Sequence, residues 1–132
     1  MNEARLAILI AAIERQEGFP IPGKLPTRLN NPGDLMFAHQ RNATPHPVIG
    51  VDGKTRIYAA FPTLADGIAA LRIQIGLDAS AARHETLEQF IARYAPIRDG
   101  NDTSAYLAGV MRALGVEDRA QLLGTILEVV AT

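Results

Sequence analysis

The composition is that of one folded domain. The chain has 132 residues, 48% of them hydrophobic and 20% charged, which suffices for a single core and excludes wholesale disorder. Its net charge of −1 gives no general attraction to nucleic acid or to an anionic cell wall, and the absence of cysteine excludes disulfides and thiolate metal sites.

The first predicted element is a helix that ends at Glu17. Apolar side chains recur there with the spacing i, i+3, i+4 and i+7, the stripe of a helix that faces a core. The residues of this stripe are Leu6, Leu9, Ile10 and Ile13. Gly18 supplies a stop signal, and Pro20 prevents the helix from continuing.

Glu17 is a carboxylate on the apolar side of this helix. At roughly 100° per residue, it points within about 20° of Leu6. A carboxyl group in the last turn, on the core side, is partly desolvated and lies at the negative end of the helix dipole, and both effects raise its pKa. A raised pKa lets a general acid keep its proton near neutral pH. The alternative is a helix-end glutamate whose carboxylate reaches into water.

Residues 18–62 follow as an irregular lobe that holds most of the prolines. Within it, the segment from Val48 to Tyr58 has two extended runs on either side of Asp52-Gly53. An Asp-Gly pair between such runs predicts a β-hairpin with a type I′ turn. We therefore expect little strand, all of it in this lobe.

Residues 63–131 contain start and stop signals for successive helices. Thr63 with Asp66 and Thr86 with Gln89 are capping boxes, the first in an acidic variant. Pro96 stops the second of these helices. Asp102 or Thr103 caps the next one, which Gly115 ends, and a last helix begins near Glu117 or Asp118. The apolar stripes are Leu64, Ile68, Leu71 and Ile75; Leu87, Phe90, Ile91 and Tyr94; Tyr106, Leu107, Val110 and Leu114; and Leu122, Leu123, Ile126, Leu127 and Val130.

The predicted fold class is therefore α+β and mostly helical. We expect a single domain over residues 1–132, with the irregular and β lobe at 18–62 and a helical lobe at 63–131. No stretch reaches the roughly 18 apolar residues of a membrane span, so we expect no membrane insertion. Glu3 and Glu14 interrupt the apolar N-terminal segment, so we also expect no signal peptide. The protein would be made in the cytoplasm, and action elsewhere would require another carrier.

The sequence lacks the residue patterns of metal sites, nucleophilic serine enzymes and phosphate-binding loops. The three histidines, His39, His46 and His84, do not have the spacing of metal ligands, and neither serine lies in a nucleophile elbow. No glycine-rich phosphate loop follows a strand. We expect no metal and no cofactor.

Several short motifs occur in the order found in one family. Asn30-Asn31-Pro32-Gly33-Asp34-Leu35 resembles the Asn-Asn-Pro-Gly-Asn-Ile/Leu signature of bacteriophage- and prophage-associated lysozyme-like proteins, which are close to soluble lytic transglycosylases. The segment Phe61–Leu71 resembles the Phe…Gly…Ala-Leu helix start of that group. Thr86-Leu87 to Tyr94-Ala95-Pro96 resembles its segment ending in Tyr-Ala-Pro, and Asn101-Asp102-Thr103 with Tyr106 matches its Asn-x-Thr-x-x-Tyr pattern. With Glu17 before Gly-Phe, the resemblance runs from about residue 13 to residue 116.

The resemblance implies a lysozyme-like fold and cleavage of the β-1,4 bond between N-acetylmuramic acid and N-acetylglucosamine in peptidoglycan. The glutamate that ends the first helix in that family aligns with Glu17 and would protonate the glycosidic oxygen. A hydrolase (muramidase) adds a second carboxylate as base or nucleophile. A lytic transglycosylase instead lets the C6 hydroxyl of the substrate attack, giving a 1,6-anhydro product, and one glutamate suffices.

Asp34 is the best candidate for a second carboxylate. The alternative is a turn residue that satisfies nearby backbone amides. The matching family position is often Asn, which argues against an essential charge and favours the single-acid, transglycosylase-like mechanism.

Asn31, Tyr94 and Tyr106 are the candidate substrate contacts. The Asn31 side chain would either contact substrate or organise the lobe through an Asx turn before Pro32. The two tyrosines resemble those that line the cleft of related enzymes, although each also suits a structural role with its ring buried. Only seven aromatic residues and no Trp provide few platforms for sugar stacking.

Two function classes follow. The first is a peptidoglycan-cleaving glycosidase of phage or prophage origin, whose partner is the glycan strand. The second is a non-catalytic lysozyme-like module that binds the cell wall or joins phage tail or virion proteins. An unrelated helical nucleic-acid-binding domain is disfavoured by the near-neutral charge.

Overall fold

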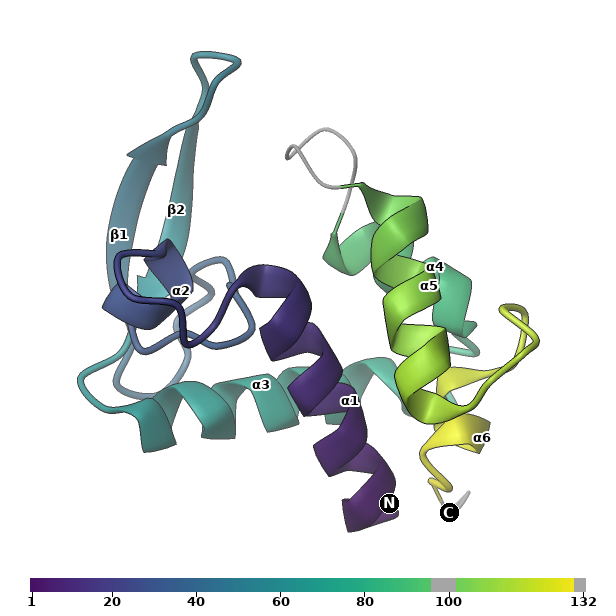
Figure 1. Cartoon of the computed structure of the whole chain (residues 1–132). Coiled ribbons are helices and arrows are strands. Elements are labelled where there is room, and N and C mark those ends of the chain that lie inside the picture. Colours follow the sequence, from purple (N-terminus) through teal and green to yellow (C-terminus); the bar gives the residue numbers. More distant parts are fainter. Residues whose placement is uncertain (96–101, 130–132) are drawn as a thin grey trace. The chain divides into compact units, whose positions relative to one another are not determined.

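The computed structural model describes residues 1–95 and 102–129 and has an α+β fold in which helices dominate, as predicted. In chain order the elements are α1 (Glu3–Glu17), α2 (Leu25–Arg28), β1 (Thr44–Ile49), β2 (Thr55–Ala60), α3 (Leu64–Asp78), α4 (Leu87–Tyr94), α5 (Thr103–Leu114) and α6 (Leu123–Ile126) (Figure 1). Pro96, Asn101 and Val130, which entered the predictions above, lie outside the described residues. No helix in the described part is long and apolar enough to cross a membrane.

The chain divides into two compact units. The terminal unit comprises Met1–Ala12 and Gln74–Thr132, and the central unit comprises Ile13–Ile73. The boundaries fall inside α1 and α3, so each of these helices contributes residues to both units. The predicted candidate residues are divided between them: Glu17, Asn31 and Asp34 belong to the central unit, and Tyr94 and Tyr106 to the terminal unit.

The predicted stripe of α1 is confirmed, because Leu6, Leu9, Ile10 and Ile13 are all buried. In the terminal unit, buried apolar side chains of α4, α5 and α6 complete the core. Phe90, Val110 and Leu123 are each fully buried there.

The caps of the later helices also match the sequence signals. Thr86 and Gln89 form a complete capping box at the start of α4. The Asp102 side chain accepts a hydrogen bond from Ala105 N–H at the start of α5, and Gly115 ends α5 in the left-handed conformation. At the start of α3, Thr63 Oγ1 accepts a hydrogen bond from Asp66 N–H and donates one to the Asp66 carboxylate. Local side-chain chemistry thus sets the beginning of each of these helices.

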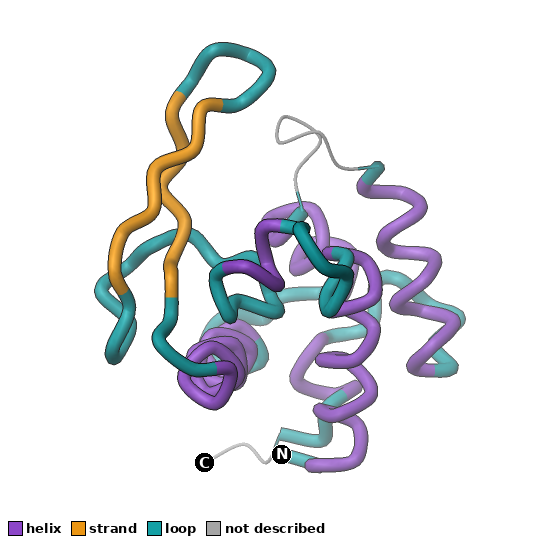
Figure 2. The backbone as a smooth tube through the Cα atoms, turned by 60° about the vertical axis from the view of Figure 1, so that its left-hand side comes forward, coloured by secondary structure: helices purple, strands orange, loops and turns teal. Residues whose placement is uncertain are grey.

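The hairpin is confirmed, but its predicted turn type is wrong. Strands β1 and β2 pair antiparallel from Thr44↔Ala60 to Ile49↔Thr55 (Figure 2). A hydrogen bond from Gly50 N–H to the Lys54 carbonyl closes a three-residue loop, and Gly53 takes a positive φ of 78° at its third position. The loop is therefore of the three-residue class with a left-handed glycine, and Asp52-Gly53 is not a two-residue turn.

The predicted last helix is also corrected. Only Leu123–Ile126 is helical, because the chain turns at Asp118–Gln121 and the extended Leu122 then pairs with Thr86 at the start of α4. Leu87 N–H donates to the Gln121 carbonyl, and Leu123 N–H donates to the Glu85 carbonyl. The Asp118 side chain accepts from Ala120 N–H and turns the chain there. These partners are distant in sequence, and the apolar spacing contains no signal of them.

The predicted apolar stripe of α3 is confirmed at Leu71 and Ile75 and is wrong at Leu64. Leu71 and Ile75 are fully buried, but Leu64 is 40% exposed, and Ile73 and Leu77 are exposed as well. Apolar residues lie on several sides of this helix, so their spacing alone does not delimit the buried face. Gly67 does, because a Cβ there would lie 1.8 Å from the carbonyl oxygen of Asn30.

Candidate functional site

Glu17 lies at the C-terminal end of α1, as predicted. The helix ends in a Schellman motif: Phe19 N–H donates to the Glu14 carbonyl at 2.9 Å, and Gly18 N–H donates to the Arg15 carbonyl at 3.4 Å. Gly18 has a φ of 80°, which only glycine adopts without strain. The Glu17 side chain is half-buried at this fixed helix end. The rise predicted for its pKa stays a prediction.

Glu14 is a second carboxylate at this end of α1, and it was not selected from the sequence. It precedes Glu17 by one helical turn and is half-buried. Burial raises the pKa of the Glu14 carboxyl above its ordinary value. The signal available in the sequence was its i, i+3 spacing from Glu17, which places the two carboxylates near each other on the helix surface.

Asn31 is completely buried and holds the turn of residues 30–35 together. Its Nδ2 donates to the carbonyls of Leu35 and Ala59, each at 2.9 Å, and its Oδ1 accepts from Leu35 N–H at 2.8 Å. Both amide hydrogens are therefore used within the protein. Of the two roles considered for Asn31, this geometry fits the organiser of the lobe.

Asp34 follows in the same turn with a φ of 51°. Its backbone N–H donates to the Asn31 carbonyl at 3.0 Å, and its side chain is half-buried. Among residues with a side chain, Asn and Asp adopt this left-handed conformation most readily. The backbone therefore explains why the position accepts either residue, independently of any charge that chemistry requires.

Two of the motifs that carry the family resemblance interlock within the central unit. The Asn30 side chain donates to the Phe61 carbonyl at 3.1 Å, and Phe61 N–H donates to the Leu29 carbonyl at 2.9 Å. Gly67 of α3 lies against the Asn30 carbonyl and the Pro32 ring. The Asn-Asn-Pro-Gly turn and the Phe…Gly helix start are thus parts of one packing arrangement.

Another two motifs interlock within the terminal unit. Thr103 Oγ1, at the start of α5, donates to the carbonyl of Ala95, which follows α4, at 2.7 Å. Tyr94 is half-buried, with its ring 5.4 Å from that of Phe90. Tyr106 is only 3% exposed. The buried Tyr106 therefore has a structural role in this conformation. Tyr94 is more accessible to solvent.

A buried charge cluster near α4 was not predicted. Asp78 is 2% exposed and accepts hydrogen bonds from Gln74, Arg83 and Arg93. Arg93 also binds both carboxylate oxygens of Glu85, and its bonds to Glu85 and Asp78 raise its pKa. The cluster ties the end of α3 to α4 and uses Arg93 for structure.

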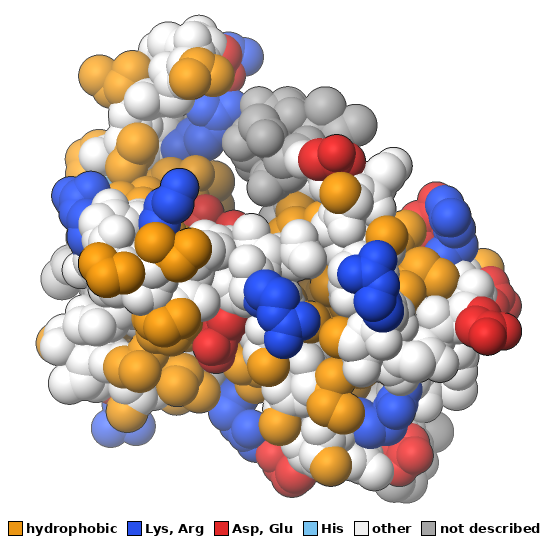
Figure 3. Space-filling view, viewed as in Figure 1, with side chains coloured by type: hydrophobic (Ala, Val, Ile, Leu, Met, Phe, Trp, Pro, Cys, Tyr) orange, Lys and Arg blue, Asp and Glu red, His pale blue; other side chains and the backbone are white. Residues whose placement is uncertain are grey.

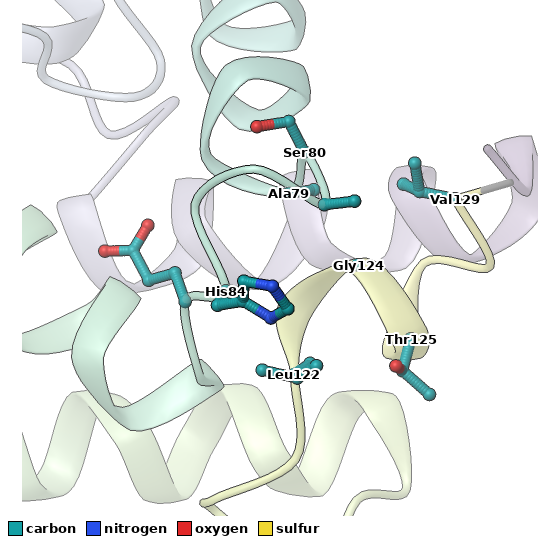
Figure 4. Close-up of a pocket in the computed structure, with 9 residues that line it drawn as sticks. Ala79, Ser80, His84, Leu122, Gly124, Thr125 and Val129 are labelled. Atoms are coloured by element: carbon teal, nitrogen blue, oxygen red, sulfur yellow. The ribbon is translucent and has the colours of Figure 1, made fainter. Parts of the chain in front are cut away.

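A pocket of about 170 Å³ lies in the terminal unit (Figure 4). Ala79, Leu122 and Val129 give it apolar walls, and Ser80 and His84 supply polar groups. None of the predicted site residues lines it. In the described ranges, 1–95 and 102–129, no group of three or more His, Asp or Glu side chains is placed to hold a metal ion.

The chain was compared with protein-family models, curated proteins and solved structures. None of them matches it. A function is therefore inferred from the residues and geometry described above.

Proposed function

We propose that this protein is a lysozyme-like glycosidase that cleaves the β-1,4 bond between N-acetylmuramic acid and N-acetylglucosamine in peptidoglycan. Glu17 is the general acid that protonates the glycosidic oxygen. The observation that carries the proposal is the position of Glu17: a half-buried carboxylate at the end of a core helix, held by a Schellman motif. Protonating a leaving-group oxygen requires a carboxyl group that is fixed in place and partly desolvated.

The arrangement of the motifs gives further support. Four of the short segments that resemble phage and prophage lysozyme-like proteins form two interlocked pairs, one in each unit. The pair in the central unit joins residues 31 positions apart in the sequence. A small hairpin lobe after the first helix is also what the resemblance implies.

The mechanism proposed is that of a lytic transglycosylase. Glu17 donates its proton to the leaving oxygen, and the C6 hydroxyl of the muramic acid residue attacks C1. The C6 hydroxyl proton returns to the Glu17 carboxylate, and the product is a 1,6-anhydro sugar. Asp34 is assigned no charge-dependent step, because its left-handed backbone already accounts for the residue type.

The alternative is a non-catalytic wall-binding or virion module. The burial of Asn31 and Tyr106 favours it, because two of the three candidate substrate contacts are occupied in holding the fold. The two functions differ in whether soluble muropeptides are released.

The test uses purified peptidoglycan sacculi and mass spectrometry of the soluble products. The wild type should release anhydro-muropeptides, and Glu17→Gln should reduce release by about 10²–10⁴-fold, the usual contribution of a general acid. Glu14→Gln is the matched control, because it removes the neighbouring carboxylate of the same helix and should retain activity. Thermal unfolding of each variant establishes that the fold survives.

Each other outcome has a definite meaning. Loss of activity in Glu14→Gln but not in Glu17→Gln would transfer the acid role to Glu14. Products heavier by one water, lost in Asp34→Asn, would identify a muramidase with two carboxylates. Binding to sacculi without any release would favour the non-catalytic module.

A further inference from the structure

An aromatic pair on the central unit presents a surface that neither the motifs nor the proposed acid uses. The rings of Phe37 and His39 lie 4.7 Å apart with a 60° tilt. Phe37 is half-buried, and His39 is exposed. The chain has only seven Phe and Tyr residues, so an aromatic pair with one exposed and one half-buried ring is an unusual feature of its surface.

The loop that carries the pair is held in one conformation. Gln40 Oε1 accepts from Ala38 N–H, and Gln40 Nε2 donates to the Met36 carbonyl, both at 2.8 Å. Phe37 N–H donates to the Ile57 carbonyl of β2 at 2.9 Å. His39 has a φ of 58°, a conformation that costs free energy for a residue with a Cβ. These hydrogen bonds fix the backbone that carries the two rings.

The neighbouring sheet extends this surface with apolar groups. Met36 pairs with Tyr58, which sets Phe37 beside Ile57, and Ile57 is paired with Pro47 of β1. Cross-strand partners share one face of a sheet. Ile57 is 47% exposed, and Pro47 is exposed as well. Hydrophobic side chains, in orange, are visible at the surface of the hairpin in Figure 3. Phe37, His39, Pro47 and Ile57 together are named the shelf.

The edge of the hairpin argues against an added peptide strand as the ligand. Pro45 and Pro47 remove two N–H donors from β1, and such prolines obstruct strand addition. A ligand must then contact the face, where it meets an aromatic ring, aliphatic groups and one imidazole. This combination suits a pyranose, whose C–H face packs on an aromatic ring while its hydroxyl or acetamido groups bond to a polar side chain.

We infer that the shelf binds an N-acetylhexosamine ring of the glycan strand, with Phe37 under the sugar and His39 hydrogen-bonded to its polar substituents. This inference rests on the proposed function, because it takes the glycan of that proposal as its ligand. Phe37 and His39 are binding residues and have no part in the proton transfer.

The test measures binding of the N-acetylglucosamine tetramer by NMR titration, in the Glu17→Gln protein so that no turnover occurs. Phe37→Leu keeps the apolar volume without the ring and should weaken binding by about tenfold, whereas Phe37→Tyr should bind within about twofold of the parent. His39→Asn tolerates the left-handed backbone and should weaken binding several-fold. Equal melting temperatures establish that the variants fold alike.

Binding by Phe37→Leu equal to that of the parent, or no binding by the parent, would overturn the inference. Cleavage of sacculi is assayed separately with Glu17 intact. If the protein cleaves sacculi but binds the tetramer independently of Phe37, the proposed function stands and the inferred sugar binding by the shelf is overturned. Binding that depends on Phe37, without cleavage by the wild type, supports the shelf and overturns the catalytic proposal.

Discussion

A single amide side chain, that of Asn31, joins three backbone groups from two segments of the central unit. Its sequence neighbours predicted an Asx turn, and the short-range bond to Leu35 has that local character. The bond to Ala59 is different, because it reaches across the fold. Sequence spacing therefore pointed to the right residue, but its burial was set by a partner 28 positions away.

We predict that Asn31→Ala destabilises the protein by about 2–4 kcal/mol, because buried backbone groups of Leu35 and Ala59 lose their partner. Asn31→Asp keeps the shape and can still accept from Leu35 N–H, but it donates to neither carbonyl and should be at least as destabilising. Urea unfolding followed by circular dichroism measures both. A change below about 0.5 kcal/mol in Asn31→Ala would contradict the assigned role.

Glu14 gives a prediction about pH. Because burial raises its folded-state pKa above the ordinary value of 4.5, the folded protein binds this proton more tightly than the unfolded chain. The contribution of protonated Glu14 to the free energy of unfolding is therefore lost as pH rises from about 4.5 through the raised pKa of the folded state. Glu14→Gln should unfold at higher urea concentration than the wild type at pH 7, and the difference should vanish near pH 4. A difference that is constant with pH would exclude this explanation.

At the level of elements, apolar spacing located only part of the buried face of α3: Leu71 and Ile75 are buried as predicted, and Leu64 is exposed. Its buried face is marked by Gly67, where the Asn30 carbonyl approaches the helix. The helix caps were predictable because Thr86 and Asp102 bond to amides three residues on. The extent of α6 was not, because extended pairing with the start of α4 overrides the local preference for helix. In the candidate site, the helix end at Glu17 was predictable from Gly18, and the accessibility of Asn31 and Tyr106 was not.

Two glycines of α3 make a matched test. Gly67→Ala should destabilise the protein by about 2 kcal/mol or more, because the new methyl group meets a backbone carbonyl. Gly76→Ala adds the same methyl group where no atom lies within 4 Å, and should stabilise by about 0.5–1 kcal/mol through helix propensity. Thermal unfolding of the two variants should therefore move in opposite directions. Equal shifts would show that helix propensity alone governs both positions.

At the scale of the whole molecule, the first residues of the chain are bonded to the last described ones. Asn2 N–H donates to the Leu127 carbonyl at 2.8 Å, and the Arg5 guanidinium donates to the carbonyls of Ile126 and Leu114. The two carbonyls lie at the ends of α6 and α5, where backbone oxygens lack helical partners. Arg5 thus satisfies two helix ends at once.

We predict that Arg5→Met destabilises the protein by about 2–3 kcal/mol, since hydrogen bonds from a charged donor are lost while the aliphatic stem is kept. Arg112→Met, which removes an exposed guanidinium in the last turn of α5, is the control and should change stability by less than about 0.5 kcal/mol. Urea unfolding compares the two. Similar losses would mean that net charge, and not the Arg5 contacts, is responsible.

The division into units also has a consequence for synthesis on the ribosome. Residues 13–73 are contiguous, so every segment of the central unit has been synthesised before the later part of the terminal unit. The terminal unit combines Met1–Ala12 with residues 74–132. Hydrogen-bond partners of its first residues, such as Leu127 for Asn2, are translated more than a hundred residues later. Leu6 and Leu9, which are fully buried in the folded protein, belong to this early segment. A growing chain therefore carries the apolar face of its first helix without its partners in the terminal unit until those later residues have been translated.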